Sequence, residues 1–307
     1  MNRKLFLSTL LALSAVACGD PLKEAQRIEE LRVLGARVSI DGEPERATPA
    51  AGESVSVEWL LADPSGLPPQ AIWHMLVCVA ESSAFGVPFC RDEPLTSVEQ
   101  SEPSATAPSI AFTVPDAETL GDAKKLAVLA IFCDSGTVEL GNDLESTTCS
   151  GAAIVQKASF DVILAGDETT NDNPNLADAV LEIDGEPWAA GSDTVDCSSD
   201  DAPRLPADGQ EHQVTLAMGE DVREVKPAEL DEVEAESLQI SHLSTLGEFD
   251  HRFSGVEPED TNLTVAVPWK APGELDSATP ASFYFVVRDD RGGVSWLART
   301  LCIEPQP

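Results

Sequence analysis

The 307-residue chain has few residues of several kinds on which binding proteins and enzymes depend. It contains one tyrosine and four histidines, and its 19 lysines and arginines face 54 aspartates and glutamates, which gives a formal net charge of −35 at pH 7. A surface so poor in cations should repel nucleic-acid phosphates and anionic lipid headgroups, so the composition argues against a nucleic-acid partner. A single tyrosine also argues against a broad aromatic platform for glycans.

Enzyme signatures are missing as well. The chain has no Gly-x-Ser-x-Gly elbow, His-Glu-x-x-His zinc motif, Walker loop, Gly-x-Gly-x-x-Gly turn or Cys-x-x-Cys pair. His74 lies in an apolar run and is interpreted as a core residue. His242 and His251 can approach each other if residues 238–243 pair with residues 248–253, and we interpret them as part of a polar strand face. The sequence therefore predicts no catalytic activity and no resident cofactor.

The N-terminus has the pattern of a secretory signal peptide. Arg3 and Lys4 precede a stretch of thirteen mostly apolar residues, 5–17, that ends in small side chains. As a helix this stretch rises only about 20 Å, which is shorter than the roughly 30 Å of hydrocarbon in a bilayer. We therefore expect residues 1–17 to be a cleaved leader and not a permanent membrane helix.

The leader ends in Ala15-Val16-Ala17-Cys18, which resembles the lipobox of bacterial lipoproteins, with alanine where leucine is commonest. The resemblance implies that the Cys18 thiol is acylated and becomes the mature N-terminus; the alternative is a plain secreted protein. More than one acyl chain gives stable membrane anchoring. Gly19 carries no obvious inner-membrane retention signal, so we expect a cell-envelope protein anchored to the outer membrane, on its periplasmic or surface face. Removal of residues 1–17 takes away two cations and no acids, which changes the charge from −35 to −37.

Six cysteines follow Cys18, an even number that predicts disulfides in an oxidising compartment. Their spacing favours two local bridges and one bridge from the start of the second half to the final strand: Cys78–Cys90, Cys133–Cys149 and Cys197–Cys302. The main alternative pairs Cys78 with Cys133 across two core strands. In the chain-entropy model a loop of about 100 residues gives the largest stabilisation, roughly 4.7 kcal/mol against about 3 kcal/mol for the short loops.

The first half of the mature chain has strand periodicity. Residues 18–30 are mostly polar and predict a short tether, after which apolar residues recur with a period of two. Two runs, 72–79 and 126–132, are apolar on both faces and predict central strands. The other expected strands are 55–61, 110–114 and 154–164. Six or seven short strands separated by turn-rich segments predict a β-sandwich over residues 31–165.

The sequence turns polar at residues 166–175, Gly-Asp-Glu-Thr-Thr-Asn-Asp-Asn-Pro-Asn, which predicts a linker. A second sandwich is expected over residues 176–307, with a hairpin turn at 289–293. The stretch 229–236 holds five carboxylates in eight residues and is interpreted as a solvated loop or short helix. The strands expected in this half are 180–183, 213–218, 238–243, 263–267, 283–288 and 294–303.

Two further features point to a repeated unit. Ile40-Asp41-Gly42-Glu43-Pro44 recurs as Ile183-Asp184-Gly185-Glu186-Pro187, each copy just after the expected first strand of its half, which favours duplication of one sandwich. The segment Phe283–Val294 resembles the final hairpin of bacterial immunoglobulin-like surface domains. The lipobox, the opening 31–34 and the turn 49–53 resemble large, mostly uncharacterised lipoproteins of myxobacterial type. The resemblance implies an all-β protein with two immunoglobulin-like β-sandwich domains in tandem, and it implies no activity.

The linker supplies a candidate metal site. Asn171-Asp172-Asn173-Pro174 resembles the calcium linker between cadherin domains, and calcium takes six to eight oxygen ligands. The resemblance implies a calcium site with five candidate ligands: Asp167, Glu168, Asp172, Asn173 and Asp178. Asn and Asp are also favoured in turns, so a plain linker is the favoured interpretation and the calcium site is the alternative.

Tryptophans supply a second binding hypothesis. Trp188 and Trp269 follow prolines in turn-like contexts, where exposed rings can stack on sugars, whereas Trp59, Trp73 and Trp296 are expected inside the sandwiches. The sequence as a whole predicts a non-catalytic envelope lipoprotein, a structural or adhesive interaction module with an envelope protein or glycan as partner. The alternatives are a calcium- or carbohydrate-dependent binding module, and a hydrolase whose site is assembled from loops.

Overall fold

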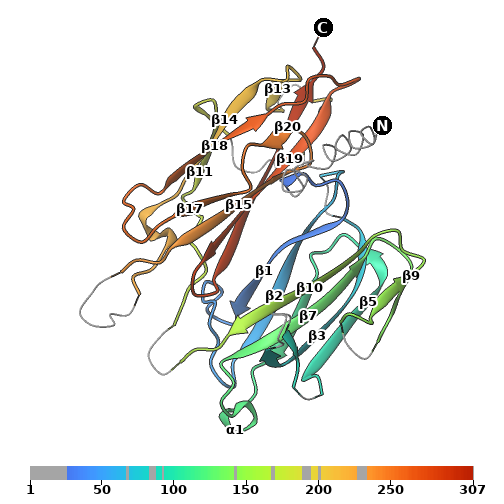
Figure 1. Ribbon diagram of the computed structural model, residues 1–307, viewed down its shortest axis with the longest axis vertical. Helices are drawn as coiled ribbons and strands as arrows, with labels where there is room; N and C mark the ends of the chain where they lie inside the picture. Colours follow the sequence, from blue (N-terminus) through green and yellow to red (C-terminus); the bar gives the residue numbers. More distant parts are fainter. Residues whose placement is uncertain are drawn as a thin grey trace, which may run out of the picture.

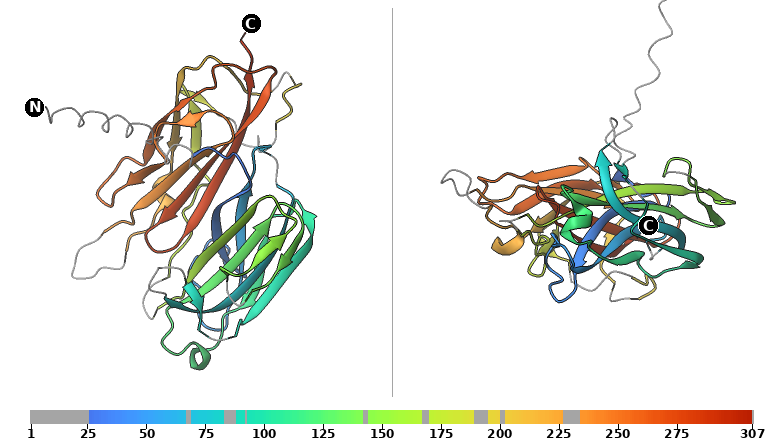
Figure 2. Two further views of the ribbon diagram at one scale, coloured as in Figure 1. Left: turned by 45° about the vertical axis from the view of Figure 1, so that its right-hand side comes forward. Right: turned by 90° about the horizontal axis from the view of Figure 1, so that it is seen from below.

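The computed structural model describes residues 26–66, 69–82, 88–91, 93–141, 144–166, 170–188, 195–199, 202–226 and 234–306. The structure is nearly all β, with 53% strand and 3% helix, which confirms the all-β prediction. Its large sheets form two facing pairs, which we call the N-terminal and the C-terminal sheet pair (Figure 1). The left-hand view of Figure 2 shows the two pairs as separate layered bodies, and an apolar contact joins them.

The N-terminal sheet pair consists of a three-stranded and a five-stranded antiparallel sheet. The first has the order β1 (Arg32–Ile40), β2 (Ser54–Ala62), β6 (Ser109–Thr113). The second has the order β10 (Val155–Ile163), β7 (Lys125–Cys133), β3 (Ala71–Ser82), β4 (Pro88–Cys90), and β5 (Thr96–Ser104) also pairs with β3. A small hairpin of β8 (Thr137–Glu139) and β9 (Thr148–Ser150) and the short helix α1 (Ala117–Leu120) lie beside them.

The C-terminal sheet pair consists of two five-stranded sheets. One has the order β12 (Glu186–Pro187), β11 (Val180–Ile183), β14 (Glu211–Ala217), β18 (Thr264–Lys270), β16 (Glu248–Phe249). The other has the order β13 (Arg204–Pro206), β20 (Val294–Glu304), β19 (Thr279–Asp289), β15 (Leu238–Ser244), β17 (Phe253–Val256). The pairing of β13 with β20 is parallel. The hairpin predicted at 289–293 joins β19 to β20, which confirms that turn.

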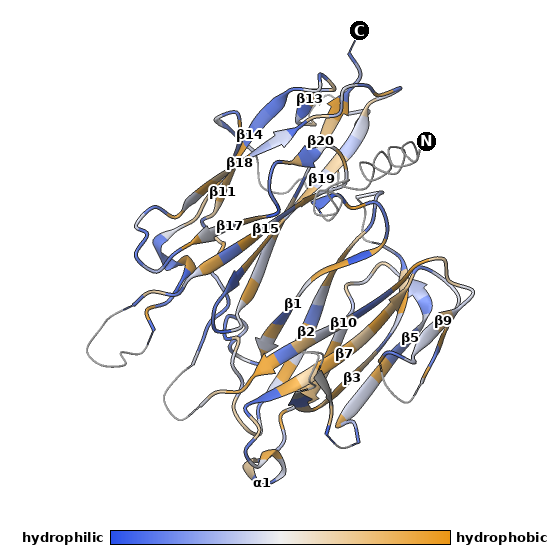
Figure 3. Ribbon diagram, viewed as in Figure 1, coloured by the Kyte–Doolittle hydropathy of each residue, from blue (hydrophilic) through white to orange (hydrophobic). Residues whose placement is uncertain are grey.

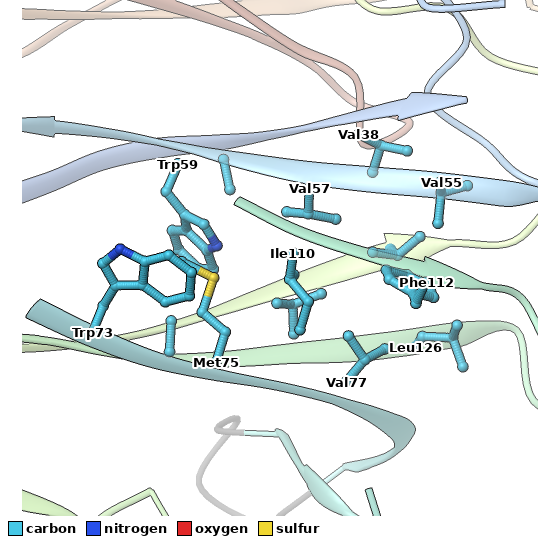
Figure 4. Packing of buried hydrophobic residues seen from close by; sticks show 14 of the residues in the cluster. Val38, Val55, Val57, Trp59, Trp73, Met75, Val77, Ile110, Phe112 and Leu126 are labelled. Carbon is cyan, nitrogen blue, oxygen red and sulfur yellow. The ribbon is translucent and has the colours of Figure 1, made fainter. Parts of the chain in front are cut away.

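The core of the N-terminal sheet pair follows from the period-two pattern. In β2 and β6 buried residues alternate with more exposed ones, so one face of each strand points inward. Figure 4 shows Trp59 of β2 directed toward Trp73 and Met75 of β3. The Trp59 ring also meets the Phe132 ring edge-on at 5.4 Å. Each large apolar side chain buried in this way stabilises the fold by about 1.5–3 kcal/mol.

The central strands β3 and β7 confirm the two runs predicted to be apolar on both faces. β7 pairs with β10 on one side and β3 on the other, and eight of its nine residues are buried. Its outer face is covered by two small apolar clusters, one around Cys133 and one around Cys78. The hydropathy colouring shows these two strands as predominantly apolar and β5 as predominantly polar (Figure 3).

The core of the C-terminal sheet pair is built from aromatic rings. Phe283 lies at its centre, with the rings of Trp188, Trp269 and Phe249 at 4.9, 5.0 and 5.9 Å in edge-to-face geometry. Edge-to-face pairs place the positive ring edge on the negative ring face and add about 0.5–1.5 kcal/mol to area burial. The Trp269 indole N–H donates to the Leu246 carbonyl at 3.1 Å, so its one polar atom is satisfied.

The three predicted disulfides are confirmed. Cys78 pairs with Cys90, Cys133 with Cys149, and Cys197 with Cys302, with Cα–Cα distances of 5.4, 6.2 and 5.6 Å. The first bridge joins β3 to β4, the second joins β7 to β9, and the third ties residue 197 to β20. The alternative pairing of Cys78 with Cys133 is wrong, because each of these cysteines has its local partner.

Two features of the fold differ from what the sequence predicts. β5 forms a strand although its sequence is polar and shows no alternation of apolar residues. It can do so because it lies at the edge of the sheet, where backbone hydrogen bonds to β3 hold it and little burial is needed. The predicted tether, 18–30, is packed at its end: Ile28 is fully buried, and its N–H donates to the Ser244 carbonyl at 2.8 Å. The rest of the tether up to residue 25, the leader and Cys18 lie outside the described residues.

Candidate functional site

The two sheet pairs meet at an apolar contact. Ile28, Leu34 and Ala62 come from the N-terminal side, and Leu243, Tyr284, Val286 and Val294 come from the C-terminal side. The strand β1 crosses so closely that a Cβ built on Gly35 would lie 3.2 Å from Val286 Cγ1. At this glycine a larger side chain would push the two sheet pairs apart, so the close approach depends on the missing side chain.

The segment predicted as a linker is partly buried in the structure. Asn171 is fully buried: its N–H donates to Thr48 Oγ1 at 2.8 Å, its carbonyl accepts from Ala47 N at 2.7 Å, and its Nδ2 donates to Asp289 Oδ2 at 3.1 Å. These partners belong to both sheet pairs. The linker therefore holds the two pairs together, because buried polar groups must find partners.

Asn173 makes the most direct connection between the two sheet pairs. Its side-chain Nδ2 donates to the carbonyls of Val38 at 2.9 Å and Glu45 at 3.0 Å, both on the N-terminal side. Its Oδ1 accepts from the Val294 N–H at 3.0 Å, on the C-terminal side. One amide thus uses both of its donor protons and its acceptor in a site that is 9% exposed.

A buried ionic cluster adjoins this segment. Glu236 is 1% exposed and pairs with Arg291 at 2.9 Å, and Arg291 also lies 3.5 Å from Glu224 and donates to the carbonyl of Thr170. Burial raises the pKa of Glu236, with the negative charge of Asp289 adding to the effect. The interpretation of 229–236 as solvated is therefore wrong at Glu236, because Arg291 supplies the countercharge that lets it be buried. Residues 227–233 lie outside the described residues.

A cavity of about 650 Å³ opens beside the junction and is the candidate functional site. Its lining comes from the N-terminal side, the linker and the C-terminal side, so it exists only when the two sheet pairs are held together. It includes five carboxylates and two arginines: Glu45, Asp172, Asp221, Glu224, Glu236, Arg37 and Arg223. We call it the acidic cleft.

The electrostatics of the acidic cleft favour cations. Burial raises the pKa of Asp172, and the nearby charges of Glu224 and Glu45 raise it further, since like charges disfavour ionisation. Among the arginines of the lining, Arg37 is engaged elsewhere: it pairs with Glu58 at 2.9 Å, and its guanidinium carbon lies 4.5 Å above the Trp296 ring. A cationic group entering the cleft would relieve the repulsion around Asp172.

The predicted calcium ligands do not gather as a set. Asp167 and Glu168 lie outside the described residues, and Asp178 is exposed and is not part of the cavity lining. Asn173 lines the cavity, but its amide oxygen already accepts from Val294 N. In the part of the chain that the structure describes, no group of three or more His, Cys, Asp or Glu side chains is arranged to hold a metal ion.

The hypothesis that Trp188 and Trp269 stack on sugars is wrong. Trp188 is 5% exposed and Trp269 is fully buried, because both rings pack on Phe283 in the core. Trp59 and Trp73 are core residues as predicted, at 2% and 8% exposure. Trp296, expected in a core, instead faces the junction beneath Arg37 and lines the acidic cleft. The sequence did contain a signal for this burial: Val265, Val267 and Trp269 occupy every second position of β18, so their side chains lie on the same inward face.

The histidines lie away from the acidic cleft, and none belongs to its lining. His242 and His251 approach each other as predicted, with ring centroids 5.7 Å apart. His242 is fully buried against Phe249 and Phe285, and burial lowers the pKa of His242 to about 4. His74 is only half-buried, opposite Glu99 of the edge strand β5, so its interpretation as a core residue is wrong. His212 pairs with Asp184 at 2.7 Å on the C-terminal sheet pair.

Comparison with known proteins gives no relative from which a function can be transferred: no family model matches the chain, and the search of curated proteins found no match. Within the described residues, no helix is long and apolar enough to cross a membrane.

We expect the substitution Asn173→Ala to destabilise the protein by about 3 kcal/mol. It leaves the Val38 carbonyl and the Val294 N–H without their side-chain partner, whereas the Glu45 carbonyl keeps the backbone N–H of residue 173. Each unpaired buried group costs about 1–3 kcal/mol. Urea denaturation measures the loss. The matched control is Asn175→Ala, which removes two exposed hydrogen bonds, to Asp221 and from the Ala177 N–H, and should cost under about 1 kcal/mol. Equal losses in the two variants would contradict the clamp.

His242 should make stability depend on pH. Between about pH 6.5 and pH 4 the unfolded chain binds a proton at this residue and the folded chain does not, so stability falls as pH falls, by about 3 kcal/mol over the window. The variant His242→Phe, which keeps an aromatic ring beside Phe249, should lose this share of the pH dependence. Urea denaturation from pH 7 to pH 4 tests it, with His251→Gln as the control that keeps the slope. A wild-type slope retained in His242→Phe would refute the assignment.

Proposed function

We propose that the protein is a non-catalytic, lipid-anchored envelope protein in which two immunoglobulin-like sandwiches form one rigid interaction module. The observation that carries the proposal is the clamped linker, in which Asn171 and Asn173 bond to both sheet pairs. A clamped linker keeps the acidic cleft in one shape. A preformed cleft binds a partner without the entropy cost of ordering two loosely joined domains.

The immunoglobulin-like assignment is supported by strand order. The order β1-β2-β6 in the N-terminal sheet pair has its counterpart in β11-β14-β18, and β10-β7-β3 has its counterpart in β20-β19-β15. These orders match the A-B-E and G-F-C arrangement of immunoglobulin-like sandwiches. The repeated turn supports duplication, since Asp41 N donates to Ser54 O and Asp184 N donates to Gln213 O, both at 2.9 Å.

The charge of the cleft favours a protein partner that presents lysines or arginines. Complementary charge speeds association and selects partners, whereas an anionic glycan would be repelled. The carbohydrate-dependent alternative also has less support because Trp188 and Trp269 are buried. For the calcium-dependent alternative, Asp172 and Asp178 are the described candidate ligands whose oxygens could still bind a metal ion. We propose no resident cofactor.

The proposed location is the cell envelope, with the outer membrane favoured, and the support for it is the leader pattern and Cys18 in the sequence. An enzyme has little support, because the sequence carries none of the standard catalytic motifs. The origin proposed from the lipobox and the short turn motifs is a myxobacterial-type lipoprotein, an inference from the sequence alone.

The substitution Cys18→Ala should release the protein from membranes, because it removes the thiol that carries the acyl chains. Membrane fractionation of cells that express each variant measures this. Gly19→Ala keeps the thiol and should leave the protein in the membrane fraction. If the Cys18→Ala protein stayed in the membrane fraction in the same amount as the wild type, the proposed anchor would be wrong.

Neutralising the exposed carboxylates of the acidic cleft should weaken partner capture. In the native envelope, cross-linking followed by mass spectrometry should recover a stoichiometric protein partner, with a yield about fivefold lower for the double variant Glu45→Gln, Asp221→Asn. The control variant Glu99→Gln, Glu102→Gln changes two exposed carboxylates of β5 and should capture normally. Recovery of the protein alone, or equal capture by all three proteins, would refute the interaction module.

A further inference from the structure

The strand β20 forms one wall of the acidic cleft, and part of its edge is open. In the sheet order β13-β20-β19-β15-β17, β20 pairs with β19 without a register shift, but it pairs with β13 only at Cys302–Glu304. The first part of the strand therefore has a sheet neighbour on one side only. Ser295, Trp296 and Leu297, which belong to this part, line the acidic cleft.

Two contacts show which backbone groups of β20 point to the open edge. The Val294 N–H donates to Asn173 Oδ1 at 3.0 Å, and the Cys302 N–H donates to the Pro203 carbonyl at 2.8 Å, so both groups point away from β19. In an antiparallel ladder the N–H and C=O of one residue point to the same side, and the side alternates along the strand. Every second residue between Val294 and Cys302 therefore presents its backbone groups to the same edge.

Trp296 and Ala298 are the first two residues that follow from this alternation. The Ala298 carbonyl accepts from Arg299 Nη1 at 2.7 Å. Four other groups have no hydrogen-bond partner among the residues that the structure describes: the Val294 carbonyl, the N–H and carbonyl of Trp296, and the Ala298 N–H. Such a row of unpaired donors and acceptors is the surface to which extended peptides add as a strand.

The open edge also adjoins a second cavity, on the face of β20 that carries Trp296 and Ala298. This cavity has a volume of about 290 Å³ and is lined mainly by apolar side chains, among them Leu60 and Tyr284. Side chains at every second position of an added strand would share this face. Apolar side chains at those positions would fit the second cavity, and the positions between them are then available for charged side chains.

We propose that the acidic cleft binds an extended segment of a partner protein, with alternating basic and apolar side chains, which adds to the open edge of β20 as a further strand. The inference rests on the interaction module proposed above and specifies how its partner binds. The five carboxylates and two arginines of the cleft lining favour a basic segment. Hydrogen bonds to the β20 backbone would supply affinity, and the side chains would supply specificity. β13 already pairs with the same edge further along the strand.

The test uses the full protein and the probe peptide acetyl-Lys-Val-Lys-Val-Lys-amide. Two further peptides carry backbone N-methyl groups, either on the valines or on the lysines. An added strand pairs through one of its two edges, and alternate residues face each edge. One methylated peptide should therefore bind about tenfold more weakly than the parent, and the other about equally. Titration followed by NMR measures the affinities. Hydrogen exchange of the Trp296 and Ala298 amides should slow about fivefold or more with saturating parent peptide.

A variant of β20 tests the edge from the side of the protein. Ala298→Pro removes one donor of the open edge, at a type of position where edge strands tolerate proline, and should weaken binding of the parent peptide about fivefold. The control Ala298→Ser keeps the N–H and should bind as the wild type does. Urea denaturation checks that both variants are folded. If Ala298→Pro does not fold, the methylated peptides on the wild-type protein decide the question.

The outcomes separate strand addition from the proposed function. Strand addition is overturned if the parent peptide does not bind, if both methylated peptides bind as the parent does, or if both are weakened equally. Binding that leaves exchange at Trp296 and Ala298 unchanged also overturns it. In these cases the interaction module still stands. Equal binding of the parent peptide by the wild type and by the double variant Glu45→Gln, Asp221→Asn would instead overturn the selection by charge on which the proposed function depends.

Discussion

The side-chain amide of Asn173 is the constraint on which the arrangement of the two sheet pairs depends. It joins the Val38 and Glu45 carbonyls to the Val294 N–H, three backbone groups that come from opposite sides of the junction. A rotation of one sheet pair against the other strains these bonds in a largely buried site, where a lost partner is costly. The apolar contact around Val286 resists separation, whereas the amide resists rotation, because hydrogen bonds are directional and apolar contacts are not.

The strands and the two short-loop disulfides were predictable from the sequence because both signals are local. Alternation with a period of two shows in strands such as β2 and β18, and each short-loop cysteine found its partner nearby. The junction was not predictable in the same way. Asn171 and Asn173 have the composition of a turn whether they face water or bind backbone groups more than 100 residues away. The proline before Trp269 suggested a turn. The alternation of apolar residues through Val267 indicated instead that the strand continues to Trp269, and this is what the structure shows.

Net charge is similarly a poor guide to local surfaces. A chain with 54 acidic and 19 basic residues has a negative mean field, yet the fold brings Arg32 beside Arg252 and Arg288, which lie more than 200 positions further along the chain. The fold also brings Glu45, Asp172 and Glu224 together at the acidic cleft. Composition gives the sum of these charges, and only the arrangement of the strands gives their separate positions.

The clamped junction has a consequence for the acidic cleft. The cleft is lined by Glu45 from the N-terminal side, by the linker and by β20, so its shape depends on how the two sheet pairs are held. The Asn173 amide bonds to both pairs, so a movement that widened the cleft would also break hydrogen bonds of that amide. A linker without these bonds would let the cleft open and close at little cost. The buried asparagines therefore connect the arrangement of the sheet pairs to the shape of the cleft.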